Sequence, residues 1–170
     1  FWVLALVLVL TQPAAAAENQ GSLKIDLDTG ELPVTNGAVT LYQVGTPADE
    51  GYRVLDYYGG GTVRYQDAVS DNLAMYYSEL AGSGRELLLD VDGQAVFSGL
   101  EAGLYLVRQT ERTDGIYPFR PFLLRLPTKG QWDLKRSPAI SPIVSGCPRT
   151  ADSGRLTLGL WGVGLSGLGL

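Results

Sequence analysis

The chain has 170 residues, with 13 basic and 18 acidic side chains, one cysteine and no histidine. A net charge of −5 argues against nucleic acid as a partner, because proteins bind the phosphates of nucleic acid through clustered lysine and arginine. A single thiol excludes an internal disulfide, and the lack of histidine removes the usual general base and metal ligand. We therefore expect no enzyme, no metal site and no cofactor.

The first residues resemble a secretory signal peptide. An apolar run covers 1–10, Pro13 follows, and Ala15 and Ala17 give the small-x-small pattern that signal peptidase needs. Cleavage is predicted between Ala17 and Glu18, and the absence of a preceding methionine indicates a truncated start. The alternatives are a buried helix or a membrane anchor, but ten helical residues span only about 15 Å, too short for a bilayer.

The middle of the chain is predicted to be mostly β. Leu23, Ile25 and Leu27 alternate with polar residues, which is typical of a half-buried strand. The pair Asp92-Gly93 is typical of a tight turn and predicts a hairpin between its flanking strands. The expected strands cover 22–28, 38–44, 52–57, 86–91, 94–97, 103–110, 119–126 and 131–135.

One segment, 70–81, predicts a helix instead. Leu73, Tyr76, Tyr77 and Leu80 fall at helical spacing, and Ser70 is a suitable N-cap. A single helix among strands indicates a sandwich with a helical crossover. We expect its tyrosine face to cover one edge of the sandwich, with a ligand surface as the alternative.

The segment 96–107 resembles the F-x-G-L-x-x-G-x-Y signature of collagen-adhesin B-type domains. These are prealbumin-like β-sandwiches in pilins and adhesins of Gram-positive bacteria. The segments 37–42 and 121–133 resemble other strands of that family, and the likeness covers about 21–143. It implies an Ig-like sandwich over 18–142, in which Gly99 and Gly103 allow a tight corner above Phe97, Leu100 and Tyr105.

The C-terminal part, 143–170, resembles a linker followed by a sortase sorting signal of the LPxTG type. An apolar run covers 156–170, and the motif residues before it are Cys147, Pro148, Arg149, Thr150 and Ala151. The resemblance implies that a sortase cysteine attacks the Thr150 carbonyl. Cys147 replaces the usual leucine and Ala151 the usual glycine. The short run without a basic tail indicates C-terminal truncation; the alternatives are a glycine-rich flexible end or an intermolecular disulfide through Cys147.

Members of this family often contain a lysine isopeptide bond, which needs a buried acid to move protons. The position of that acid looks like Gln109, which cannot transfer protons. Glu111 is a substitute if it points to the same face. Lys24 and Asp133 are then the candidate bonding pair, and the alternative is that no bond forms.

Together these patterns predict a cell-wall-anchored, extracellular surface protein of a Gram-positive bacterium. Its expected partners are a sortase, peptidoglycan or pilin subunits, and a host glycan or matrix protein. Related shaft pilins carry a lysine after Ser-Pro, but Ser137-Pro138 is followed here by Ala139. A basal or tip pilin or an adhesin is therefore expected; the alternative is a secreted, stand-alone glycan- or protein-binding module. A hydrolase would need a carboxylate pair or a Ser-Lys dyad, and no local motif indicates either.

Overall fold

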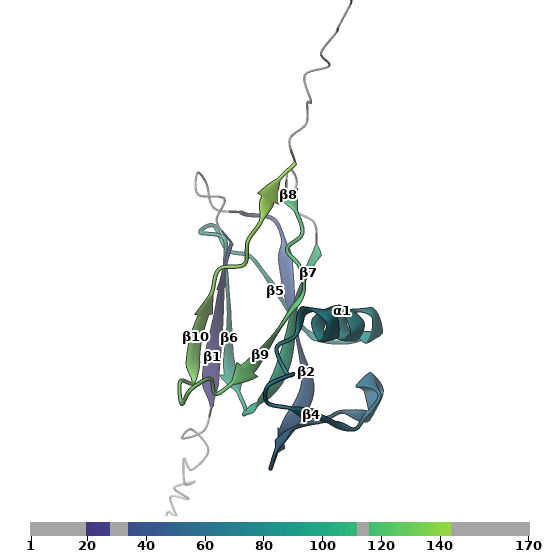
Figure 1. Ribbon diagram of the computed structural model, residues 1–170. Helices are drawn as coiled ribbons and strands as arrows, with labels where there is room; N and C mark the ends of the chain where they lie inside the picture. Colours follow the sequence, from purple (N-terminus) through teal and green to yellow (C-terminus); the bar gives the residue numbers. More distant parts are fainter. Residues whose placement is uncertain (1–19, 28–33, 112–115, 144–170) are drawn as a thin grey trace, which may run out of the picture.

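The computed structural model describes residues 20–27, 34–111 and 116–143. These residues form two packed β-sheets, a separate pair of short strands, and one α-helix against the larger sheet (Figure 1). The predicted, mainly β sandwich with a single inserted helix is confirmed. The apolar ends predicted from the sequence lie outside the described residues.

The smaller sheet has three strands in the order β10-β1-β6, with β1 parallel to β10 and antiparallel to β6. The bounds are Gly21–Asp26 for β1, Gln94–Leu100 for β6 and Asp133–Arg136 for β10. The alternation of β1 is as predicted, since Leu23 and Ile25 are fully buried while Lys24 and Asp26 are half-buried on the opposite face.

The larger sheet runs β4-β3-β2-β7-β9, and β5 also pairs with β2. Its centre is the antiparallel pair β2 and β7, and β3 and β5 share the other edge of β2. The strands are β2 (Ala38–Ala48), β3 (Gly51–Val54), β4 (Thr62–Arg64), β5 (Arg85–Leu88), β7 (Gly103–Glu111) and β9 (Phe122–Leu126).

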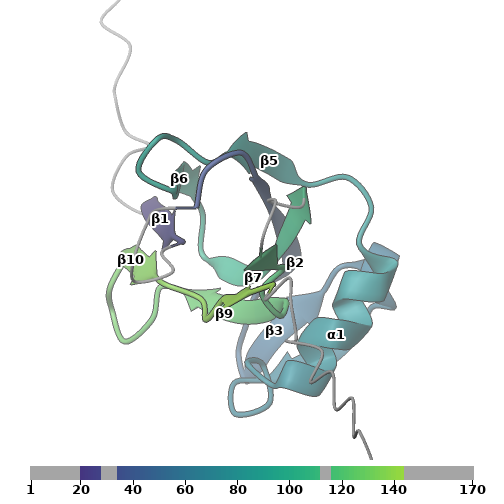
Figure 2. The ribbon, with the colours of Figure 1, turned by 90° about the horizontal axis from the view of Figure 1, so that it is seen from above.

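The larger sheet is buried on both faces. One face contributes Leu41, Tyr105 and Val107 to a core shared with the smaller sheet. The other face contributes Leu104 and Leu106 to a second core, which lies beneath the helix α1 (Asp71–Leu80) and the 3₁₀ turn η1 (Asp56–Tyr58). Figure 2 shows α1 outside the sheet, on the side opposite the smaller sheet.

The helix begins as predicted, because the Ser70 hydroxyl accepts a hydrogen bond of 3.3 Å from the Leu73 amide. Its placement at an edge of the sandwich was wrong. Ala74 and Tyr77 are buried against the face of the larger sheet, whereas Tyr76 is exposed. A helix beside an open sheet face removes more apolar surface from water there than at an edge.

Two other local predictions were wrong. The turn at Asp90–Gly93 forms, with the Gly93 amide 3.0 Å from the Asp90 carbonyl oxygen. The strands on either side do not make the predicted ladder, because β5 pairs with β2 and β6 pairs with β1 in the other sheet. The strand predicted over 52–57 ends at Val54, and η1 follows, closed by Gly59 at a φ of 95°.

The main core gives a direct test of this packing. Phe97 is 0% exposed, whereas its neighbour Val96 points outward and is 49% exposed. We expect Phe97→Ala to lower the free energy of unfolding by about 3–5 kcal/mol, because it leaves a cavity between the sheets. Val96→Ala should cost about 0.5 kcal/mol or less. Urea unfolding followed by circular dichroism measures both, and equal losses would contradict the assigned register.

Candidate functional site

The corner between β6 and β7 has the geometry that the family signature implies. Phe97, Leu100 and Tyr105 are buried in the main core beneath it. Gly99 has a φ of 68°, a conformation that other residues rarely adopt. The Tyr105 hydroxyl donates a hydrogen bond of 2.8 Å to the carbonyl oxygen of Glu101, which ties the start of β7 to the turn.

The candidate isopeptide pair lies on the smaller sheet. Lys24 faces away from the core and is paired in register with Lys135, while Asp133 lies opposite Ser22. The Ser22 hydroxyl donates a hydrogen bond of 2.7 Å to Asp133, which is exposed. Lys24 and Asp133 are therefore on adjacent strands, on the solvent side of the sheet.

The candidate proton-transfer residues lie on the other sheet. Gln109 is buried in β7, 7% exposed; its amide oxygen accepts from the Phe119 amide at 3.3 Å, and its amide nitrogen donates to the Glu111 carbonyl at 3.2 Å. Glu111 is exposed, at a point where the register between β2 and β7 shifts. The shift explains why Glu111 does not share the burial of Gln109. The structure does not bring Glu111 to Lys24.

This arrangement makes a mass measurement informative. An isopeptide bond releases water or ammonia, and it needs the amine in its neutral form beside a buried acid. Lys24 faces solvent and the buried position is an amide, so we expect the intact folded chain to show no mass deficit. A deficit that disappears in Lys24→Ala would contradict this expectation.

The last described residues lie at one end of the sandwich. Ser141–Pro142 forms β11, which pairs with β8 (Ile116–Tyr117) at the end of the sandwich labelled β8 in Figure 1. The predicted sorting residues Cys147, Pro148, Arg149, Thr150 and Ala151 lie outside the described residues, and so do Ala15 and Ala17. Within 20–27, 34–111 and 116–143, no helix is long and apolar enough to cross a membrane.

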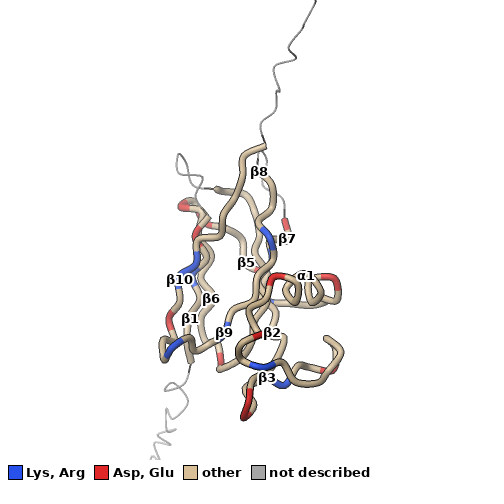
Figure 3. Tube along the Cα trace, viewed as in Figure 1, with Lys and Arg blue, Asp and Glu red and all other residues tan. Residues whose placement is uncertain are grey.

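Charged side chains give little indication of a metal or polyanion site. Basic and acidic residues are interspersed along the trace in Figure 3. No group of three acidic or cysteine side chains that could ligate a metal occurs in the part of the chain that the structure describes. The one ion pair there joins Lys135 and Asp26 at 2.6 Å across β10 and β1.

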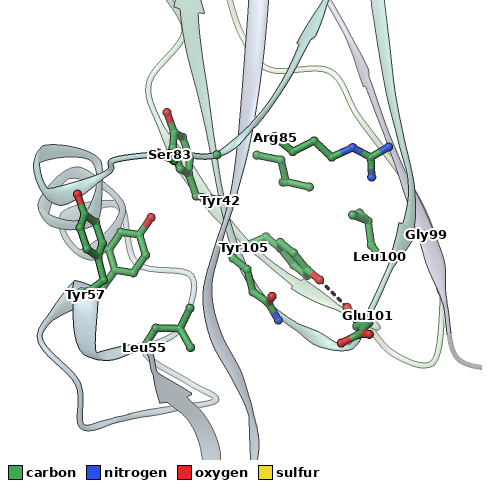
Figure 4. A pocket seen from close by; sticks show the side chains of 13 residues that line it. Tyr42, Leu55, Tyr57, Ser83, Arg85, Gly99, Leu100, Glu101 and Tyr105 are labelled. Carbon is green, nitrogen blue, oxygen red and sulfur yellow. Dashed lines mark hydrogen bonds between the residues drawn. The ribbon is translucent and has the colours of Figure 1, made fainter.

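The surface carries an open groove of about 760 Å³, which we call the edge groove. It lies where the edge of β2 passes between β5 and β3, close to the corner between β6 and β7. Figure 4 shows Tyr57 and Leu55 on one side of it, Leu100 and Glu101 on the other, and Tyr42 and Tyr105 between them. Gln43, Tyr58 and Ser83 also line it.

The tyrosines beside the groove pack against one another. Tyr58 makes edge-to-face contacts with Tyr57 and Tyr77, with ring centroids 5.2 and 5.6 Å apart. Burial raises the pKa of Tyr58 to about 12, and Tyr42 and Tyr57 add to the shift. Burial also raises the pKa of Tyr77, on the buried face of the helix.

The raised pKa of Tyr58 predicts a loss of stability in alkali. Above the ordinary pKa of 10.0, tyrosine in the unfolded chain loses its proton, while Tyr58 in the folded protein keeps it up to about pH 12. The unfolded state then binds fewer protons, so the free energy of unfolding falls as the pH rises across this window. The free energy of unfolding of Tyr58→Phe, measured by urea titration, should fall less steeply between these pH values. Tyr117→Phe replaces an exposed tyrosine outside this cluster and is the control; identical slopes for Tyr58→Phe and the unaltered chain would contradict the assignment.

Sequence reasoning did not find the edge groove. The residues that line it fall in four segments of the chain, 41–43, 55–58, 83–85 and 99–105. The signal in the sequence was the tyrosine pair at 57–58, which lines the groove.

Comparison with known proteins gives a fold but no close relative. No family model and no curated protein matches the chain. The full-length major pilin SpaD from Corynebacterium diphtheriae matches with a TM-score of 0.51 and 17% identity, over 74% of this chain and 30% of that one. The chain has a pilin-like fold. It spans about 30% of the length of that major pilin.

A second solved structure is matched over most of its own length. The SpaB basal pilin from Lactobacillus rhamnosus GG matches with a TM-score of 0.47 and 15% identity, over 71% of this chain and 95% of that one. At such identities the likeness concerns the fold alone.

Proposed function

We propose that this chain is a pilin-like surface subunit or adhesin that a sortase joins to the cell wall through Thr150. The observation that carries the proposal is the pilin-like sandwich, which ends in the strand β11, here called the exit strand, and is followed by a sequence that resembles a sorting signal. The chain would be exported, freed of 1–17, and displayed on the surface of a Gram-positive bacterium. Sortase, peptidoglycan and pilin subunits are the proposed partners.

The proposed chemistry is acyl transfer performed by the sortase. Its cysteine thiolate attacks the Thr150 carbonyl carbon, a thioester forms, and the bond to Ala151 breaks as the Ala151 amine takes a proton. An amine of a wall precursor or a pilin lysine then attacks the thioester and releases the thiolate. Thr150 thereby becomes amide-linked, and the part from Ala151 onward is discarded. The chain itself supplies the acyl donor and no catalytic group.

The exit strand supports this role because it sets how far the motif extends from the domain. Five residue steps separate Pro142 from Cys147, at most about 18 Å of extended chain. The sortase would thus work close to the β8–β11 end of the sandwich. Ser-Pro pairs at 137–138 and 141–142 favour an extended linker over a helix.

A terminal position in a pilus fits better than the shaft. Shaft subunits need a donor lysine, and the chain has lysines only at 24, 129 and 135. Lys135 is paired with Asp26, and Lys24 lies beside it on the outer face of the smaller sheet. Ala139 stands at the position where the family resemblance expects the donor. We therefore propose a basal or tip pilin, or a wall-anchored adhesin.

Substitution of the acyl donor residue tests the proposal. In cells that express the matching sortase, Thr150→Ala should move most of the protein from the wall fraction into the medium or membrane, because sortases select threonine before the cleaved bond. Ser153→Ala, three residues later, should leave wall attachment unchanged. Fractionation followed by immunoblotting measures both. Undiminished wall attachment of Thr150→Ala would remove Thr150 from the mechanism.

A further inference from the structure

We propose that the edge groove binds a neutral saccharide. This goes beyond covalent display, because it assigns a ligand class to a surface that the anchoring chemistry does not use. The groove volume of about 760 Å³ falls within the range of roughly 300–1,000 Å³ that is usual for small-ligand sites. It is open to solvent along one side, which suits an oligosaccharide end.

One side of the groove supplies an aromatic platform. Tyr57 is 63% exposed, yet its ring packs edge-to-face on Tyr58. A Cβ at Gly82 would collide with the Tyr57 hydroxyl, so the loop before β5 closes over the end of this side chain. An exposed ring that is fixed in place can stack on the apolar C–H face of a sugar at little entropic cost.

Polar groups line the same groove. Tyr42 and Tyr58 are among the lining residues, and each is only 5% exposed. A tyrosine hydroxyl can both donate and accept a hydrogen bond. Gln43 adds an amide with donors and an acceptor, and Glu101 adds a carboxylate acceptor. Sugar hydroxyls both donate and accept, so they complement this mixed set.

The charge around the groove disfavours an anionic ligand. Arg85 is the only basic residue among those that line it. Its guanidinium donates a hydrogen bond of 2.6 Å to the Ser98 carbonyl oxygen and lies 5.9 Å from the centre of the Phe97 ring. Figure 4 shows this side chain extending away from the tyrosines. Glu101 then leaves the groove neutral to acidic, which favours an uncharged saccharide over a sialylated or sulfated one.

An extended peptide fits the groove less well. Along this edge, β5 pairs with β2 up to Leu41 and β3 pairs from Gly45 onward. The carbonyl oxygen of Val44 already accepts from the Leu55 amide at 2.9 Å. Only Tyr42 and Gln43 are left on this edge, and two residues are too few for strand addition, which depends on a row of main-chain hydrogen bonds.

The test uses the purified chain on an array of immobilised oligosaccharides. The array carries neutral glycans ending in glucose, galactose or mannose, with sialylated and sulfated versions of each, and extended peptides as a separate arm. We expect binding to at least one neutral glycan, with no gain from added charge. Binding only to charged glycans, only to peptides, or to nothing on the array would overturn the proposal.

Matched tyrosine variants then locate the site by calorimetric titration with the best neutral glycan. Tyr57→Ala should weaken binding about tenfold or more. Tyr117→Ala replaces a tyrosine of similar exposure, 58%, outside the groove, and should change binding by less than about twofold. Equal losses in both variants would overturn the assignment.

Two further variants separate the possible causes of a loss. Tyr57→Phe keeps the stacking ring, so its affinity should stay within about threefold of that of the unaltered chain. This result would show that the ring at this position, and not its hydroxyl, carries the binding. Thr150→Ala should bind the glycan as the unaltered chain does. A failed glycan test with intact wall attachment would leave the anchoring proposal standing, and the reverse result would leave the groove assignment standing.

Discussion

The double-sided burial of the β2–β7 pair is the constraint on which the rest of the structure depends. Antiparallel sheets commonly leave one face in water, but here side chains on both faces of β7 are buried, with Tyr105 and Val107 on one side and Leu104 and Leu106 on the other. The first face needs the smaller sheet, and the second needs α1 and η1. The chain contains a single cysteine, so no internal disulfide supports this packing. The fold is therefore stabilised mainly by two apolar layers that share one sheet.

The features that the sequence predicted correctly are those specified by neighbouring residues. The helix could be predicted because Ser70 caps it and its apolar residues repeat at helical spacing, and both signals lie within a dozen positions. The corner at Gly99 likewise depends on one short segment. The hairpin at Asp92-Gly93 was mispredicted for the opposite reason: the turn is local, but the partner of each flanking strand is distant. Thr40 of β2 and Glu86 of β5, for example, meet across 46 positions through a hydrogen bond of 3.2 Å.

The same distinction explains one site prediction that failed and one site that was not predicted. Glu111 was expected beside Gln109 because strand side chains alternate, but the register shift between β2 and β7 interrupts the alternation there and leaves Glu111 exposed. The edge groove could not be predicted because it exists only where β5 and β3 leave a gap along β2. That gap depends on where two strands end, and strand ends are less firmly specified by sequence than strand centres.

The two proposals are compatible because they use different parts of the molecule. The exit strand β11 pairs with β8, next to a smaller hollow lined by Tyr117, Phe122 and Pro138, and none of these residues lines the edge groove. The groove lies instead beside the corner between β6 and β7, which Figure 1 shows at the other end of the sandwich from β8. Attachment through Thr150 would fix the β8–β11 end near the wall and direct the groove away from it. Within the domain, the edge-to-face packing of Tyr57 on Tyr58 fixes the aromatic side of the groove.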